Sequence, residues 1–236
     1  MRKQLSFVVF VVITIILAGC RSIQTEAEIG SLQGVKGAMA RGANVNSRTF
    51  YWGTSALHQA ANNGHTDIVA YLIDQGADVN IRTEGGDVPL HSAARNGHIK
   101  VMQLLIDNGT DLKQWGTGCG TPLQWAARAD QLRAAKLLIE SGADVDNKGS
   151  KPLYGPLRDA IGNENPKMVE LLLQHGANVD AVVNGCSSLH FSYSIRNAEI
   201  AQILLHYGAD PELECKGHKV PVDFLQGQTK EREKSQ

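Results

Sequence analysis

Between Thr54 and Asn80, small and apolar residues alternate with polar ones in two short runs at helical spacing. The first run is rich in alanine and ends at Gly64, and the second opens at Thr66 and ends at Gly76. The apolar positions of the second run are Ile68, Val69, Leu72 and Ile73. A glycine just past the last apolar turn supplies a left-handed helix end, so the pattern predicts two helices. Helices this short are marginal alone, so the pair needs similar neighbours.

The same two-helix pattern recurs along the chain at steps of 32 to 34 residues. The glycines that end successive units are Gly42, Gly76, Gly109, Gly142, Gly176 and Gly208. The leucines that open the first helices are Leu57, Leu90, Leu123, Leu157 and Leu189, with Val222 in the sixth slot. Repeats of this period stack on their neighbours and form a solenoid instead of one closed core.

The repeat resembles the ankyrin repeat. The residues that carry the resemblance are Val88–Ala94 (Val-Pro-Leu-His-Ser-Ala-Ala), Thr121–Ala127 (Thr-Pro-Leu-Gln-Trp-Ala-Ala) and Gly76–Asn80 (Gly-Ala-Asp-Val-Asn). The resemblance implies an all-α, ankyrin-repeat solenoid of stacked helix-turn-helix units joined by β-hairpin loops.

The pattern also predicts the boundaries of the array. Residues 1–19 are expected to be a signal peptide, 20–27 a lipidated tether, 28–226 the array and 227–236 a polar tail. The array opens with a degenerate unit, because terminal repeats expose one face to solvent, and ends with a truncated one. The five full repeats begin near Phe50, Thr83, Gly116, Ser150 and Val182.

The N-terminus has a basic start at Arg2 and Lys3, an apolar run over 7–17, and the tetrapeptide Leu17-Ala18-Gly19-Cys20. The tetrapeptide resembles the lipobox of bacterial lipoproteins, which implies acylation of Cys20. Arg21 stands where an inner-membrane retention aspartate would be, so the resemblance implies the periplasmic face of the outer membrane. The alternative is a transmembrane anchor, but the apolar run is shorter than the roughly 20 residues that a spanning helix needs.

The formal net charge is −1, and removal of Arg2 and Lys3 with the leader lowers it to −3. This balance gives no general case for binding nucleic acid. Apart from Cys20, the chain has three cysteines: Cys119, Cys186 and Cys215. We expect them to be small buried residues. The alternative is a disulfide between Cys186 and Cys215, which lie in adjacent hairpins.

Eight histidines raise the question of a metal site. His58, His91 and His190 occupy the histidine slot of the repeat, where the resemblance implies a hydrogen bond that supports the turn. No histidine pairs with cysteine or carboxylate at ligand spacing, so we expect no metal and no cofactor. Recurrent acidic and amide residues at repeat spacing are interpreted as turn residues, namely Asp78, Asp144, Asn178 and Asp210. No catalytic motif is present, so we expect a protein that is not an enzyme.

Three repeats depart from the pattern at the inter-helix glycine, which is replaced by Asp130, Glu164 and Arg196. Ile161 and Tyr193 stand where a small alanine belongs. We expect these larger residues to shift the helix pairs locally.

Ankyrin arrays typically bind proteins through hairpin tips and the concave face of the first helices, so the resemblance implies a protein-binding surface. The residues assigned to it are Tyr51, Trp52, Thr54, Arg82, Glu84, Asp87, Arg95, Asn96, Trp115, Trp125, Arg128, Tyr154 and Phe191. All three tryptophans belong to this set, and tryptophan, tyrosine and arginine dominate binding hot spots. The alternative is that these aromatics pack on neighbouring hairpins.

The combined expectation is a lipid-anchored bacterial envelope protein that binds a protein partner. Two versions remain open. One is an immunity protein that neutralises a toxic secreted effector such as a lipase, as some ankyrin-repeat envelope lipoproteins do. The other is a scaffold for a resident envelope or stress-response protein.

Overall fold

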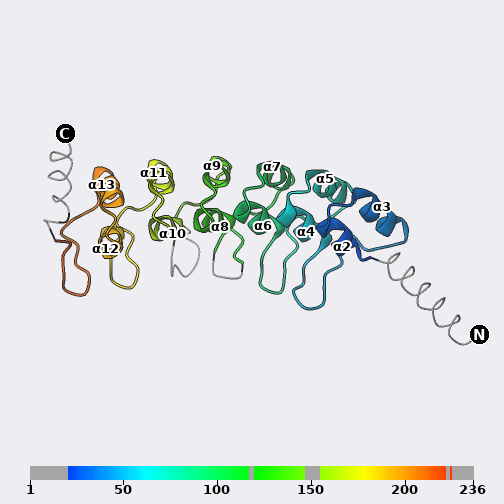
Figure 1. The fold of residues 1–236 in the computed structure, drawn as a ribbon, viewed down its shortest axis with the longest axis horizontal. Helices are drawn as coiled ribbons and strands as arrows, with labels where there is room; N and C mark the ends of the chain where they lie inside the picture. Colours follow the sequence, from blue (N-terminus) through cyan, green and yellow to red (C-terminus); the bar gives the residue numbers. More distant parts are fainter. Residues whose placement is uncertain (1–20, 117–119, 147–154, 222–223, 225–236) are drawn as a thin grey trace, which may run out of the picture. The chain divides into compact units, whose positions relative to one another are not determined.

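The computed structural model describes residues 21–116, 120–146, 155–221 and 224. Within these residues the regular elements are short α-helices, which alternate between the first and the second helix of a repeat (Figure 1). Contacts between Cα atoms divide the chain into two compact units. The N-terminal unit comprises residues 1–93 and 100–110, and the C-terminal unit comprises 94–99 and 111–236.

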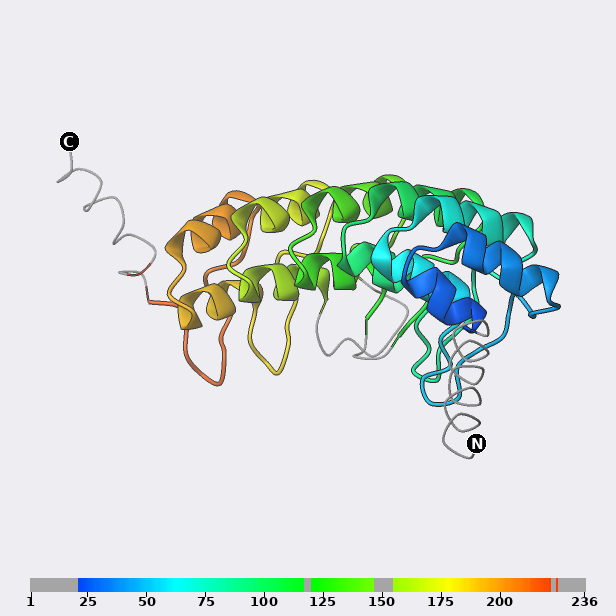
Figure 2. The ribbon, with the colours of Figure 1, turned by 45° about the vertical axis from the view of Figure 1, so that its right-hand side comes forward.

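Each unit has a layer of first helices and a layer of second helices (Figures 1 and 2). In the N-terminal unit the helices are α2 (Ile23–Glu28), α3 (Leu32–Ala40), α4 (Ala56–Asn63), α5 (Thr66–Asp74), most of α6 (Pro89–Arg95) and most of α7 (Ile99–Asp107). In the C-terminal unit they are α8 (Pro122–Arg128), α9 (Leu132–Glu140), α10 (Pro156–Gly162), α11 (Pro166–Gln174), α12 (Ser188–Ser194) and α13 (Ala198–His206). The predicted helix-turn-helix repeat is confirmed.

Polar side chains cap the start of several of these helices. Ser55 forms a capping box with His58 at the start of α4, and Thr121 accepts a hydrogen bond from the Gln124 backbone N–H at the start of α8. The predicted start of α11 is also confirmed, because Asn165 Oδ1 accepts from the Met168 N–H at 3.0 Å and a proline follows at the first helical position. Each cap satisfies a backbone donor that the helix leaves unpaired.

Left-handed residues separate the two helices of a repeat. Gly64 takes φ +75°, and the three residues that replace this glycine, Asp130, Glu164 and Arg196, take φ of 55°, 54° and 59°. The backbone therefore keeps the same turn in all four repeats. The three side chains carry the steric cost of a left-handed residue that glycine avoids.

The core lies between the two helix layers of each unit. Ile68, Val69 and Leu72 of α5 are fully buried, as are Ala60 and Ala61 of α4. The small alanines let the first helix approach the second closely, and the branched side chains of the second helix fill the space between repeats. The apolar stripe that the sequence predicts is therefore the packed face.

Aspartate and asparagine side chains link each hairpin to the next repeat. Asn46 Oδ1 accepts from the Asp78 N–H at 2.9 Å, and Asp78 Oδ1 accepts from the Asn80 N–H at 2.8 Å. In the C-terminal unit, Asp180 makes the equivalent link to the Asp210 N–H at 3.0 Å. Their interpretation as turn residues is confirmed. The described hairpins are closed by isolated bridges, such as Arg48 with Ser55, instead of extended strands.

The N-terminal unit starts earlier than the sequence predicts. Residues assigned to the tether form helix α2, in which Ile23, Gln24 and Ala27 are buried. Helix α2 packs beside α4 as a first helix does, so the degenerate repeat begins at Ile23. The signal peptide and the lipidation site Cys20 lie outside the described residues, as does most of the truncated C-terminal unit. No described helix has the length and apolar character to cross a bilayer.

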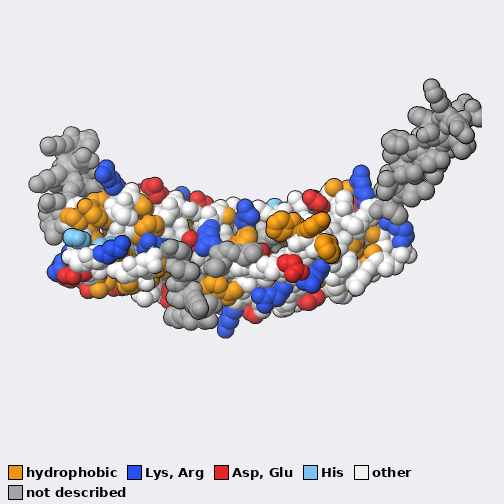
Figure 3. All heavy atoms as spheres, turned by 90° about the horizontal axis from the view of Figure 1, so that it is seen from below, with side chains coloured by type: hydrophobic (Ala, Val, Ile, Leu, Met, Phe, Trp, Pro, Cys, Tyr) orange, Lys and Arg blue, Asp and Glu red, His pale blue; other side chains and the backbone are white. Residues whose placement is uncertain are grey.

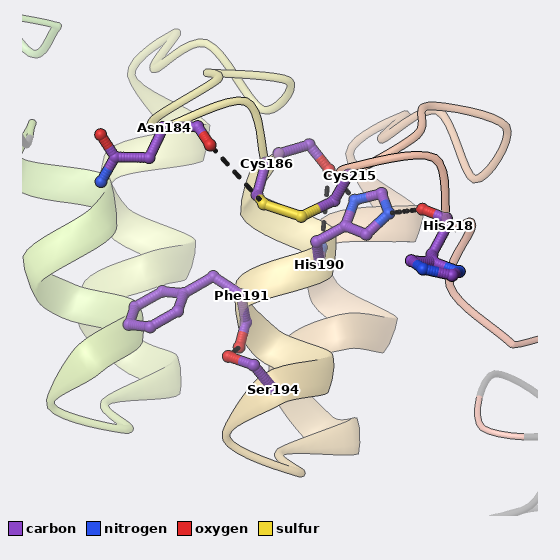
Figure 4. Close-up of a disulfide and its surroundings, with 8 residues drawn as sticks. Asn184, Cys186, His190, Phe191, Ser194, Cys215 and His218 are labelled. Carbon is purple, nitrogen blue, oxygen red and sulfur yellow. Dashed lines mark hydrogen bonds between the residues drawn. A yellow bond between two sulfur atoms is a disulfide. The ribbon is translucent and has the colours of Figure 1, made fainter.

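The cysteines of the last two hairpins form a disulfide, Cys186–Cys215, with Cα atoms 4.5 Å apart (Figure 4). The preferred expectation that these two cysteines are small buried residues is therefore wrong, because both side chains are only half-buried and are bonded to each other. The bond lies near His190 of α12, whose Nε2 pairs with the His218 carbonyl oxygen at 3.0 Å and so links α12 to the last hairpin. Cys119 lies outside the described residues.

Candidate protein-binding surface

The residues predicted to bind a partner fall into two groups, one in each unit. The N-terminal unit carries Tyr51, Trp52, Thr54, Arg82, Glu84 and Asp87 on its first two hairpins. The C-terminal unit carries Arg95, Asn96, Trp115, Trp125, Arg128 and Phe191. Tyr154 lies outside the described residues. Each group is described by itself.

The first hairpin of the N-terminal unit ends in three exposed aromatic side chains, which we call the aromatic tip. Phe50, Tyr51 and Trp52 are 92%, 83% and 76% exposed. The rings of Phe50 and Tyr51 meet edge to face, with centroids 5.3 Å apart. The sequence analysis did not assign Phe50 to the surface. Its position next to Tyr51 and Trp52 could have indicated that it belongs there.

The second hairpin holds the aromatic tip in place. The Glu84 N–H donates to the Trp52 carbonyl oxygen at 3.1 Å, and Arg48 Nη1 donates to the Arg82 carbonyl oxygen at 2.9 Å. Gly53, the residue after Trp52, takes φ +64°, and a Cβ there would lie 2.9 Å from the Glu84 backbone nitrogen. Arg48 and Glu84 also form an ion pair at 3.8 Å. The tip is therefore presented on two hairpins that are fixed to each other.

Thr54 and Asp87 have structural contacts. The Thr54 N–H and hydroxyl both bond Thr49, which closes the hairpin beneath the tip. The Asp87 carbonyl oxygen lies 2.9 Å from His58 Nε2, and His58 Nδ1 lies 2.9 Å from Ser55 Oγ. Burial lowers the pKa of His58, against the opposing effect of the Asp87 carbonyl and carboxylate. The role predicted for the repeat histidine, support of the turn by hydrogen bonding, is confirmed here.

In the C-terminal unit, two arginines lie over two aromatic rings of the first helices. The guanidinium of Arg95 is 5.6 Å from the centroid of the Trp125 ring. The guanidinium of Arg158 is 3.7 Å from the centroid of the Phe191 ring. Both rings are half-buried, so Trp125 and Phe191 are neither free in solvent nor inside the stack. Each pair attracts a cation to the face of an aromatic ring.

A partly buried ion pair lies near these two cation–π pairs. Arg128 Nε donates to Asp159 Oδ2 at 3.0 Å, and Gln124 Nε2 donates to the same oxygen at 2.7 Å. Burial raises the pKa of Asp159, while Gln124 and Arg128 oppose that rise. Asn163 completes the cluster by donating to the Arg128 carbonyl oxygen at 2.7 Å, which satisfies a backbone group at the end of α8.

The two cation–π pairs and the ion pair together form a surface that we call the first-helix surface. Its residues are Arg95, Trp125, Arg128, Arg158, Asp159 and Phe191. Sequence reasoning missed Arg158 and Asp159. Both follow Leu157 as Gln124 and Trp125 follow Leu123, so alignment of the repeats was the signal. Trp125, Asp159 and Phe191 therefore occupy one repeat slot on three adjacent first helices.

The described residues hold no group of three or more histidine, cysteine, aspartate or glutamate side chains able to bind a metal ion. Their histidines have other partners. His58 and His190 support turns, and His175 Nδ1 bonds the Leu171 carbonyl oxygen at 2.9 Å. Polar groups of the first-helix surface pair with one another across repeats.

Comparison with known proteins identifies the repeat. A family model for three ankyrin repeats matches residues 25–115 and 154–215, and a model for many ankyrin repeats matches 93–139. An ankyrin repeat protein of Acanthamoeba polyphaga mimivirus is 36% identical over 74 residues, which is 31% of this chain and 10% of the relative. Ankyrin repeat domain-containing protein 40 of mouse and of human is 33% identical over 67 residues, 28% of this chain and 18% of each relative. The chain thus spans a small part of these relatives.

Among solved structures, the ankyrin repeat domain of human ASB11 matches with a TM-score of 0.76 and 27% sequence identity. The match covers 85% of this chain and 90% of that domain. The fold class expected from the sequence is therefore confirmed. Ankyrin-repeat proteins are typically non-enzymatic scaffolds for protein interaction. The repeats of this chain therefore indicate a protein partner. With family models matching more than half of its length, the chain belongs to the ankyrin-repeat family.

Proposed function

We propose that this protein is a lipid-anchored protein of the bacterial envelope that binds a protein partner through its first-helix surface. The observation that carries the binding role is the run of Trp125, Asp159 and Phe191 on adjacent helices, with arginines over both rings. Contacts between repeats fix these side chains before a partner arrives. Little conformational entropy is then lost on association.

The chemistry of the surface suits a partner with acidic and apolar groups. Arg95 and Arg128 are exposed at its edge, and the half-buried rings of Trp125 and Phe191 supply apolar area between them. Arginine and tryptophan are the residue types that most often dominate binding energy. Asp159 holds Arg128 in place and so supports this arrangement.

Two features support the envelope location. The Leu17-Ala18-Gly19-Cys20 tetrapeptide resembles a lipobox, which makes Cys20 the proposed lipidation site. The second feature is the Cys186–Cys215 disulfide. Disulfides persist in oxidising compartments such as the periplasm and are rare in the reducing cytosol. The periplasmic face of the outer membrane satisfies both features.

Affinity capture from envelope extract tests the binding role. The full chain is compared with an Arg95→Ala/Trp125→Ala variant and with a matched Gln174→Ala/Gln202→Ala control, whose exposed side chains lie on second helices. We expect one partner to be retained by the chain and the control, and lost by the first variant at unchanged circular dichroism. Equal retention by all three proteins would refute the proposed surface.

The identity of the captured protein also distinguishes the two versions of the function. A toxic effector encoded beside this gene would identify an immunity protein, and killing of a deletion strain by its siblings would agree. A resident envelope protein, with no killing of the deletion strain, would identify a scaffold.

A further inference from the structure

The aromatic tip is not explained by a partner on the first-helix surface. Its members are almost fully exposed, and Phe50, at 92%, has the greatest exposure among the large hydrophobic residues described. Seen from the hairpin side, hydrophobic side chains gather in a cluster flanked by charged ones (Figure 3). Exposed apolar clusters of this kind mark sites of contact with a protein partner or a membrane.

The tip is connected to the start of the described chain. Gln24 Nε2, in the first turn of α2, donates to the Ser47 carbonyl oxygen at 2.8 Å and lies 2.9 Å from Ser47 Oγ. Ser47 lies on the hairpin that carries the tip. Cys20 is four positions before Gln24 and Tyr51 is four positions after Ser47, so the chain between each pair can span at most about 14 Å. The hairpin that carries the tip is therefore bonded to α2, the first helix after Cys20 in the sequence.

The composition of the tip suits the interface of a bilayer. Tryptophan and tyrosine concentrate at the level of the headgroups, where an apolar ring and a polar atom are both accommodated. Arg48 and Arg82 flank the tip and are exposed, which suits anionic headgroups. Glu84, an acidic side chain on the second hairpin, is paired with Arg48 at 3.8 Å.

We infer that the aromatic tip inserts into the interfacial layer of the membrane that anchors the N-terminus. The inference rests on the proposed lipid anchor. Insertion adds a second membrane contact to the anchor, so it fixes the orientation of the N-terminal unit on the bilayer. It assigns Tyr51 and Trp52, which the sequence analysis gave to a protein partner, to a lipid surface.

Tryptophan fluorescence in vesicles tests the inference on the full chain. The vesicles contain phosphatidylethanolamine and phosphatidylglycerol, with or without bromine on the acyl chains. A Trp115→Phe/Trp125→Phe variant keeps only Trp52, and a Trp52→Phe/Trp115→Phe variant keeps only Trp125 as the matched control. Phenylalanine at position 52 keeps the tip aromatic. Flotation of the vesicles reports anchoring separately.

We expect both variants to float with the vesicles. The emission of Trp52 should shift to the blue and fall with brominated lipid, and the emission of Trp125 should do neither. Flotation with unchanged Trp52 emission would overturn the inference and leave the anchor standing. Failure to float would overturn the anchor and the inference together.

Discussion

Arg128 Nε lies 3.0 Å from Asp159 Oδ2, and the two side chains come from adjacent first helices of the C-terminal unit. The pair joins two repeats beside the Trp125 and Phe191 stacks. It is partly buried, with side-chain exposures of 35% and 16%. It therefore retains more interaction free energy than an ion pair in open solvent, although water still screens it.

A double-mutant cycle measures this coupling. Arg128→Ala and Asp159→Ala should show a coupling free energy of unfolding of about 1 kcal/mol. The matched control is Lys136 with Glu140, an exposed pair at 3.8 Å within one helix, which should couple by about 0.3 kcal/mol. Urea unfolding of the full set checks both values. Equal couplings for the two pairs would mean that the inter-repeat bond adds nothing.

His58 should make folding sensitive to acid. Burial lowers its pKa below the ordinary value of 6.5, so the unfolded chain binds a proton that the folded chain does not. The contribution of neutral His58 to stability is therefore complete above pH 6.5 and declines as the pH falls toward the folded-state pKa. Glutamine occupies the same slot at Gln124, so His58→Gln is a conservative replacement.

The test compares the free energy of unfolding of the chain and of His58→Gln between about pH 7 and pH 5. We expect the loss of stability on acidification to be smaller in the variant. An identical pH dependence in both proteins would show that His58 does not contribute to it.

Arg196 takes φ +59° at a position that glycine fills in other repeats. The left-handed conformation costs a residue other than glycine about 1 kcal/mol. Glycine loses more conformational entropy on folding, which offsets part of this difference. Arg196→Gly should therefore raise the free energy of unfolding by a few tenths of a kcal/mol. The reverse change at an equivalent position, Gly64→Ala at φ +75°, should lower stability. Thermal unfolding of both variants gives the two signs, and a destabilised Arg196→Gly would contradict the strain argument.

The Cys186–Cys215 disulfide closes a loop across 29 residues and ties the last two hairpins together. A loop of this length stabilises the folded state by up to about 3.6 kcal/mol through the unfolded chain. Reductant should therefore lower the unfolding midpoint of the chain. Cys186→Ser/Cys215→Ser should resemble the reduced chain and be indifferent to reductant. A midpoint that reductant leaves unchanged would exclude a stabilising role.

The repeat itself was predictable because each unit needs the same few residues. A helix that ends at Gly64 or Gly76, a histidine that closes a turn and an apolar stripe on the second helix are local requirements, and they recur with the period of the stack. The turn between the helices is also kept where glycine is replaced, since Asp130 and Glu164 adopt the left-handed conformation that glycine adopts in other repeats.

Contacts between repeats were harder to predict. The stacking of Arg95 on Trp125 and the pairing of Arg128 with Asp159 join residues about one repeat apart, and nothing near either residue specifies the partner. The disulfide was given second place because adjacency of two hairpins does not fix the separation of their Cα atoms. Helix α2 was assigned to a tether because its polar surface hides the burial of Ile23 and Ala27.

Site-specific photocrosslinking in living cells tests the central claim most directly, that the first-helix surface holds a protein partner. A photoreactive amino acid replaces Gly162 or Ser194, at exposed ends of first helices beside the surface, or Gln174 or Gln202, at exposed positions of second helices. We predict one discrete protein adduct from the first pair and none from the second. Adducts of equal yield from both pairs, or from the second pair alone, would contradict the claim.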